Sequence, residues 1–297
     1  MQLGLPRTNG VRSFKERSGR IILLLAALVS IATVLLITIF IFQQGVPVFG
    51  KVSVLDFLFS TKWLPTGNPP AYGILSFVWA SFMVTALSLL FATPVALAVA
   101  VYLAEFAKGR RASILRSSIE LLAGIPSIIY GLFGIAVIVP AIRNIFGGTG
   151  YSLLAAAIIL AIMILPTIIN ISEVSIRAVN DELRYASVAM GATKWETISR
   201  VVLPAAKSGI FTSIILGLGR SVGETTAVLL VGGNAAIFAR TPLDMGRTLT
   251  MNIITDMSYA EGTHLQSLFA TAMLLFIVIL VLNYIVVRVA RHSRMED

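Results

Sequence analysis

Long runs without a charged residue set the first limit on how this chain can fold. The earliest run, residues 21–42, contains 22 residues and no Asp, Glu, Lys or Arg. At about 1.5 Å per residue, a helix of that length spans a bilayer hydrocarbon core of about 30 Å. A cleaved signal peptide has a shorter apolar core, roughly 7–15 residues. We therefore expect residues 21–42 to be a retained membrane-spanning helix.

Five more apolar segments follow, and they predict an all-α integral membrane protein with six transmembrane helices. The expected spans are residues 21–42, 72–104, 119–139, 151–171, 208–231 and 265–287. The tails and loops around them are residues 1–20, 43–71, 105–118, 140–150, 172–207, 232–264 and 288–297. The composition agrees with this class, because 12% of the residues are charged whereas a soluble domain averages about 25%.

The distribution of basic residues indicates the orientation of the chain. Of the 23 Lys and Arg residues, 17 lie in the two tails and in the loops 105–118 and 172–207. The opposite side has five, which are Lys51, Lys62, Arg143, Arg240 and Arg247. By the positive-inside rule, both termini are expected in the cytoplasm. The formal net charge of +9 is therefore a topology signal rather than a nucleic-acid-binding surface.

Several functional classes lack the side chains that they need. The chain has no cysteine, which excludes disulfides, thiol catalysis and cysteine-ligated metals. The expected spans contain no His and no Asp, so an intramembrane enzyme would have no nucleophile–base or metal set. Residues 45–51 match the start of a phosphate-binding loop, but Val52 occupies the Ser/Thr position that holds Mg²⁺. We expect no catalytic residue, metal or cofactor in this chain.

Arg220 and Glu224 interrupt the fifth apolar run near its middle. If residues 208–231 form one helix, the two side chains lie one turn apart on the same face. A charge at the bilayer centre costs about 2.5–3.5 kcal/mol on insertion scales, so such residues usually face a bundle interior or an aqueous path. One interpretation is that Arg220 offers its donors to a passing oxyanion while Glu224 holds it in place. The alternative is a pair that neutralises itself and sets helix register.

Other small and polar residues in the spans are weaker candidates. Gly219 and Gly223 have the G-x-x-x-G spacing that lets helices approach closely, so we expect a packing role. Thr85 belongs with Ser81 and Ser88 to a polar stripe of hydroxyl side chains on the second span, which could line a path or bond to neighbouring helices. Ser127 and Tyr130 follow a break expected at Pro126, where exposed backbone could face a cavity.

The polar stretch 172–207 contains a pattern typical of a docking device. Apolar residues recur at helical spacing on both sides of Gly191, which predicts two short amphipathic helices joined at a sharp turn. Such a helix pair fits a groove of a partner protein. The candidate docking residues are Tyr185, Ala186, Ser187, Met190, Gly191, Ala192, Trp195, Leu203 and Pro204.

This stretch resembles the EAA loop of ABC importer permeases, in which alanines and a glycine are followed, after nine residues, by a short apolar segment that ends in Leu-Pro; here that segment is residues 201–204. Ala186, Gly191, Leu203 and Pro204 match that pattern, and Tyr185 stands where the family often has glutamate. Residues 120–131 and 217–228 are similar to the PstC-type permeases of phosphate importers. The resemblance extends over nearly the whole chain, from the first span to the last.

The resemblance implies the type I ABC importer permease fold, with a core permease domain at about residues 72–290. It further implies a heterodimer with a PstA-like permease, two copies of a PstB-like ATPase that carry Mg-ATP, and a PstS-like phosphate-binding protein outside. The expected function is phosphate import by alternating access, with the loop at residues 185–204 receiving the ATPase. A permease of this class for another oxyanion or small solute is the alternative. A proton-coupled secondary transporter using Glu224 is a third hypothesis, and it leaves that loop unexplained.

Overall fold

The computed structural model describes residues 10–293, so residues 1–9 and 294–297 of the expected basic tails lie outside the described part. Five described helices are long and apolar enough to cross a membrane, and a helix pair bent by 67° makes up to six. The five are Gly19–Gly50, Leu75–Phe106, Ser127–Phe146, Leu153–Arg177 and Gly262–Ile285, and the bent pair is Lys194–Ala205 with Lys207–Gly223. The predicted all-α membrane class is confirmed.

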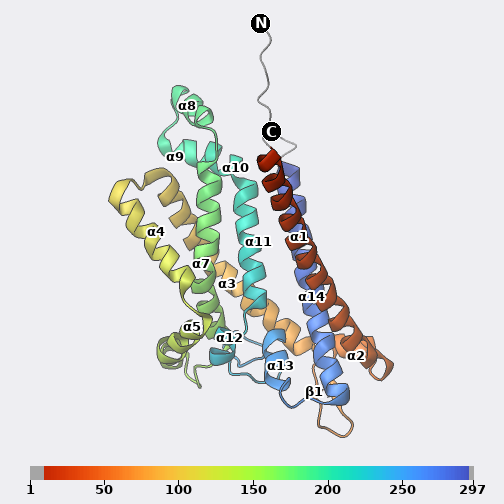
Figure 1. The fold of residues 1–297 in the computed structure, drawn as a ribbon. Coiled ribbons are helices and arrows are strands. Elements are labelled where there is room, and N and C mark those ends of the chain that lie inside the picture. Colours follow the sequence, from red (N-terminus) through yellow and green to blue (C-terminus); the bar gives the residue numbers. More distant parts are fainter. Residues whose placement is uncertain (1–9, 294–297) are drawn as a thin grey trace.

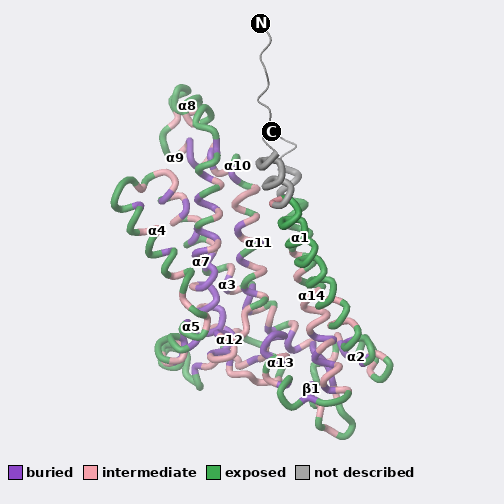
Figure 2. Tube along the Cα trace, viewed as in Figure 1, coloured by how far each residue is buried: buried purple, intermediate pink, exposed green. Residues whose placement is uncertain are grey.

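The first and last long helices, α1 (Gly10–Gly45) and α14 (Gly262–Ser293), lie side by side along one edge of the molecule (Figure 1). Gly45 permits their close approach, because a Cβ atom there would lie 2.9 Å from the backbone nitrogen of Ala270. Phe40 and Phe269 meet edge to face nearby, with ring centroids 5.5 Å apart. The apolar residues 21–37 of α1 remain exposed (Figure 2), so lipid or another subunit must cover them.

Three helices form the centre of the bundle: α3 (Leu75–Val101), α7 (Leu153–Arg177) and α11 (Lys207–Gly223). Alanines on α3 and α7 are fully buried, which allows the two backbones to pack closely. Two buried hydroxyl pairs join α11 to its neighbours, Ser88 with Ser221 at 3.0 Å and Ser172 with Ser213 at 2.8 Å. The polar stripe on the second span therefore helps to hold helices together.

The expected third span is interrupted near its start. Helix α4 (Gly109–Gly124) ends before an extended Ile125–Pro126 pair, and α5 (Ser127–Phe133) begins after it. A π-helical turn, η3 (Gly134–Ile138), and α6 (Val139–Phe146) complete the crossing. The residue before a proline avoids helical geometry, which explains the break. The continuous helical stretch that is long and apolar enough to cross a membrane is Ser127–Phe146, whereas the expected span 119–139 is broken at Ile125–Pro126 and α4 precedes the break as a separate helix.

The prediction of one continuous helix over residues 208–231 is wrong. Helix α11 ends at Gly223, Glu224 is extended with φ −71° and ψ 136°, and α12 (Thr226–Val231) begins after Thr225. The Glu224 carboxylate accepts the backbone N–H of Ala227 at 3.1 Å, so it satisfies a free donor in the first turn of α12. A glycine followed by a carboxylate that caps the next helix favours two helices over one.

Short elements close one end of the bundle. They are η1 (Val46–Gly50), α2 (Val54–Phe59), the antiparallel strands β1 (Trp63–Leu64) and β2 (Ala71–Tyr72), and α13 (Leu249–Asp256). We call this the β1–α13 end. The opposite end holds α8 (Asp181–Ala189), α9 (Lys194–Thr197), η4 (Ile198–Val202) and α10 (Leu203–Ala205) (Figure 1). We call it the α8–α9 end.

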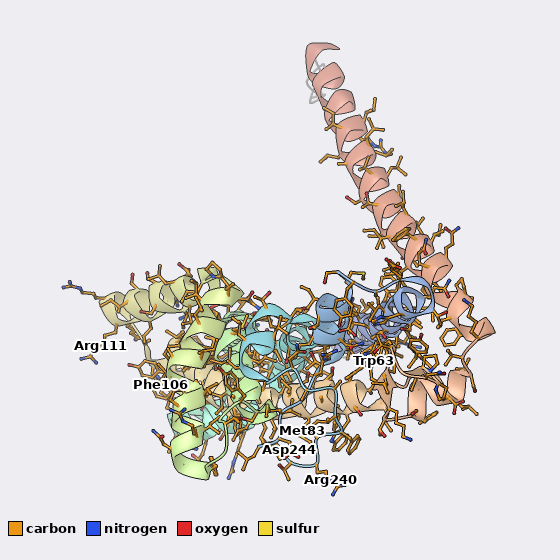
Figure 3. The ribbon with its side chains drawn as sticks, turned by 90° about the horizontal axis from the view of Figure 1, so that it is seen from below. Trp63, Met83, Phe106, Arg111, Arg240 and Asp244 are labelled. Atoms are coloured by element: carbon orange, nitrogen blue, oxygen red, sulfur yellow. The ribbon has the colours of Figure 1, made fainter. Side chains whose placement is uncertain are left out.

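Four side chains surround Asp256 at the β1–α13 end, and they come from β1, α14 and the loops on either side of α13. Its carboxylate accepts the Trp63 indole N–H at 3.0 Å and the Tyr259 hydroxyl at 2.6 Å, and Arg247 pairs with it at 3.0 Å. His264 Nε2 lies 3.3 Å away. Trp63 accordingly lies among α13 and α14 (Figure 3). Burial raises the pKa of Asp256, but the hydrogen bonds and Arg247 outweigh it, so the pKa is lowered from 3.8.

The substitution Asp256→Asn is expected to loosen this end. Removing one partner of a buried ion pair costs about 3–5 kcal/mol, because Arg247 would be left uncompensated. A carboxylate with a lowered pKa stabilises the fold above its unfolded pKa of about 3.8 and loses this effect as pH falls through its folded value. Thermal unfolding can be followed by tryptophan fluorescence. The difference in Tm between parent and variant should be constant from pH 5 to 8 and should become smaller below pH 4. A difference in Tm that disappeared near neutral pH would contradict the assignment of the stabilisation to Asp256.

Candidate functional site

The two short helices expected around Gly191 are present and are capped as isolated helices need to be. The Asn180 side chain accepts the N–H of Glu182 at the start of α8, and Thr193 with Glu196 forms a capping box at the start of α9. The backbone and side-chain hydrogen bonds from Thr193 lower the pKa of Glu196. Gly191 turns the chain with φ +89°, and nothing lies within 4 Å of the place where its Cβ would be. The predicted helix–turn–helix at this glycine is confirmed.

Most of the candidate docking residues face outward. The largest, Tyr185, Met190 and Trp195, are 72%, 90% and 64% exposed, although apolar side chains of this size are usually covered. A hollow of about 580 Å³ lies between the two helices, and its lining includes Ala186, Ser187, Met190, Gly191 and Ala192. The α8–α9 end thus offers both apolar projections and a recess.

Two of the candidate docking residues also hold the loop itself together. Ser187 on α8 bonds to Thr197 on α9 at 2.9 Å, and Leu203 packs against the buried cluster that contains Ala100 and Val202. Pro204 is exposed beside it. Ser187 and Leu203 therefore set the shape of this surface, whereas the aromatic residues and Met190 project from it.

Arg220 lies in the last turn of α11 and is exposed to the space beside the bundle. Its Nη1 atom donates to Thr167 on α7 at 3.4 Å. Within residues 10–293, no ion pair joins it to Glu224, whose carboxylate caps α12 and whose carbonyl accepts the Thr250 hydroxyl at 2.9 Å. The expectation that Glu224 holds Arg220 is thus not met, because the two lie on opposite sides of the helix break.

Two helix breaks lie close together here. Helix α5, after the first break, packs against α12, after the second, and a Cβ on Gly131 would lie 2.4 Å from the Leu230 side chain. Tyr130 is buried, and its hydroxyl donates to the carbonyl of Leu122 across the first break at 2.6 Å. Ser127 is half-buried at the start of α5. Tyr130 therefore closes a gap in backbone hydrogen bonding, and the site is built from irregular backbone with Arg220 beside it.

The other candidate residues on the spans, Thr85, Gly219 and Gly223, differ in their packing. Thr85 is buried, and its carbonyl accepts the Ser88 hydroxyl at 2.9 Å. Nothing lies within 4 Å of a Cβ placed on Gly219 or Gly223, so neither glycine makes a close helix contact within the described part of this chain. On α11, a glycine that does permit a close contact with α7 is Gly209, where a Cβ would lie 2.4 Å from the Ser175 Cβ atom. Gly209 is followed by Ile210, Phe211 and Thr212, and this local sequence carries no signal that would have identified the contact.

Ion pairs near the α8–α9 end were not expected from the sequence. Glu173 on α7 is 6% exposed and accepts Arg116 at 2.7 Å and Arg177 at 2.9 Å. Glu105, at the end of α3, pairs with Arg184 on α8. The signal for the Arg177 pair was its i,i+4 spacing, whereas partners 57 and 79 residues apart leave no local pattern. Among the described residues, no cluster of three or more His, Asp or Glu side chains could hold a metal.

Comparison with known proteins places these features in context. The family model for "Binding-protein-dependent transport system inner membrane component" matches residues 96–294. "Probable ABC transporter permease protein YqgH" of Bacillus subtilis (strain 168) is 39% identical over 284 residues, which are 95% of this chain and 91% of that protein. "Phosphate transport system permease protein PstC" of Xylella fastidiosa (strain Temecula1) is 34% identical over 244 residues, 75% of each.

Solved structures share the same fold. The MetNI methionine ABC transporter in inward-facing conformations matches with a TM-score of 0.59 and 23% identity, over 74% of this chain and 95% of that one. A bacterial ABC transporter involved in the import of alginate matches with a TM-score of 0.62 and 16% identity, over 95% and 99%. These neighbours establish that the helices have the arrangement of a type I ABC importer permease.

Proposed function

The chain belongs to the binding-protein-dependent transport system inner membrane components, and from this premise we propose that it moves inorganic phosphate across the cytoplasmic membrane. As the permease subunit of an ABC importer, it would work by alternating access. Hydrolysis of Mg-ATP on a separate ATPase subunit would drive the cycle. The relatives named as phosphate transport permeases, at 31–34% identity over most of the chain, support the substrate.

Arg220 is the observation that carries the proposal within this chain. It is an exposed guanidinium that lies next to two helix breaks, in a helix that carries no other charged residue after Lys207. A planar fork of donors suits the oxygens of a phosphate ion. Because Glu224 is committed to α12, the charge of Arg220 is not cancelled by an adjacent carboxylate. An anion passing this point would meet a free positive charge in a low-dielectric surrounding.

The α8–α9 end is the proposed contact for the ATPase. Its exposed Tyr185, Met190 and Trp195 supply apolar anchors for a groove on another protein. Helix α11 begins at this end and contains Arg220 in its last turn, and its 17 residues make a helix about 25 Å long. Motion of the loop would thus reach the anion path through one continuous element.

The remaining partners follow from the surfaces that this chain leaves open. A PstA-like permease would pack beside it, with Gly219 and Gly223 permitting close approach. Two copies of a PstB-like ATPase would bind, one to each permease. A PstS-like phosphate-binding protein would deliver the ion at the β1–α13 end. The excess of basic residues at the other end supports a cytoplasmic position for the ATPase side and for both termini.

Reconstitution with these partners tests the proposal. Proteoliposomes with loaded binding protein outside and Mg-ATP inside should accumulate radiolabelled phosphate, and the uptake should persist when an ionophore collapses the proton gradient. Liposomes with a hydrolysis-defective ATPase serve as the matched control. Uptake that disappeared with the proton gradient alone would overturn the ATP-driven function. Uptake of radiolabelled phosphate that an excess of sulfate suppressed as strongly as unlabelled phosphate would overturn the substrate while leaving the class intact.

A further inference from the structure

Glu105 holds both halves of the α8–α9 loop. It lies in η2 (Tyr102–Phe106), the π-helical turn that extends α3. Its carboxylate pairs with Arg184 on α8, and its backbone carbonyl accepts Lys194 Nζ, from α9, at 2.6 Å. Lys194 also lies 4.2 Å from the centre of the Phe106 ring. Two helices on either side of the Gly191 turn thus attach to one residue at the end of a transmembrane helix.

These cations satisfy a helix end that lacks partners of its own. The last carbonyl groups of a helix have no N–H donor within the helix, and basic side chains can bind to them favourably. The Leu103 carbonyl accepts Arg177, and the Glu105 carbonyl accepts Lys194. Cations from α7, α8 and α9 therefore contact Leu103, Glu105 and Phe106 of η2. The end of α3 is thus bonded to α7 and to both helices of the α8–α9 loop.

Burial distinguishes the Glu105 contact from an ordinary surface ion pair. The side chains of Glu105 and Arg184 are 11% and 19% exposed, whereas Asp181, which also pairs with Arg184, is 75% exposed. Arg184 is further fixed by donating to the Ile176 carbonyl at 2.7 Å. Salt screens a partly buried pair much less than an exposed one. The link to Glu105 is therefore rigid, and the link to Asp181 is weak.

The link matters because α3 reaches the region of the anion path. Beyond its packing along α7, α3 bonds to α11 through Ser88 and Ser221, and Ser221 is the neighbour of Arg220 in the chain. Building on the proposed function, we propose that Glu105 is a positioning residue for coupling. It makes the end of α3 move with the α8–α9 loop, so that the ATPase displaces α3 and α11 together rather than α11 alone.

Variants at both ends of the link test this role. In the reconstituted complex, Glu105→Gln should lower phosphate uptake per ATP hydrolysed by about tenfold, the loss expected for one charge-assisted hydrogen bond. The ATPase should still co-purify, and its stimulated hydrolysis should persist. Asp181→Asn is the matched control, since it removes an exposed carboxylate from the same arginine, and it should leave uptake per ATP unchanged. Arg184→Gln combined with Glu105→Gln should be no worse than either change alone.

Distances within the complex give a second readout, which leaves Glu105 and Arg184 unchanged. The chain has no cysteine, so a double variant with Lys108→Cys, beyond α3, and Glu182→Cys, on α8, can carry one spin label at each site. Their separation should stay the same with and without ATP. A separation that changes with ATP overturns the proposal, as does unchanged uptake per ATP in Glu105→Gln or equal damage from Asp181→Asn. Absence of any phosphate uptake by the parent complex would instead reject the proposed function.

Discussion

Replacing Arg220 with glutamine is expected to remove most of the phosphate uptake while the complex stays assembled. The guanidinium has one long hydrogen bond, 3.4 Å to Thr167, and its side chain is exposed, so its removal should hardly affect folding. A hydrogen bond to a charged group contributes about 1.5–3 kcal/mol, which corresponds to a roughly 10- to 100-fold loss of transport. Uptake in proteoliposomes and co-purification of the ATPase measure the two effects separately.

The controls for this substitution separate anion binding from general positive charge. Arg220→Lys keeps the charge but loses the planar fork, and we expect it to retain only part of the uptake. Arg143→Gln removes an exposed arginine from the last turn of α6, away from the helix breaks, and should leave uptake unaltered. If Arg220→Gln dissociated the two permeases instead, Arg220 would be an assembly residue and the path would have to lie elsewhere.

Glu224 shows why a pair seen in the sequence need not be a pair in space. The i,i+4 spacing predicted one helical face, but that inference assumes that the helix continues through Gly223. A carboxylate has an alternative use, which is to accept the free N–H groups at the start of a helix, and here it accepts Ala227. The competition between these two uses depends on where the helix ends. Periodicity in an apolar run does not reveal that point.

The α8–α9 loop was predictable from local signals. Gly191 and the helical spacing on each side of it lie within a few residues of one another, and the structure adds the Thr193–Glu196 capping box at the start of α9. The class of the protein was equally accessible, because span length follows directly from the thickness of a bilayer. By contrast, Glu105 is one of several charges near the ends of the spans, and its partner is 79 residues away. The packing of α3, α7 and α8 determines which charged residues form ion pairs. Periodicity in the sequence does not predict that packing.

The substitution Gly191→Pro is expected to detach the ATPase or uncouple it from transport. Proline fixes φ near −65°, whereas Gly191 has φ +89°. It also lacks the N–H that Gly191 donates to the Val188 carbonyl at 2.9 Å. The turn between α8 and α9 must therefore change direction, which moves Met190 relative to Trp195 on the proposed docking surface. Uptake should fall by at least about tenfold, since several anchors would be lost at once.

The effect should be confined to the loop, and this makes the experiment decisive. Because nothing lies within 4 Å of a side chain at position 191, the substitution should leave the thermal stability of the bundle unchanged. Gly191→Asn is the control, since asparagine tolerates positive φ and keeps the N–H, and it should retain most of the uptake. If asparagine were as harmful as proline, a side chain at this position would itself be obstructing the ATPase. A fully coupled Gly191→Pro complex would show that the orientation of α8 against α9 does not transmit the motion, and the coupling would then have to pass through another surface of the chain.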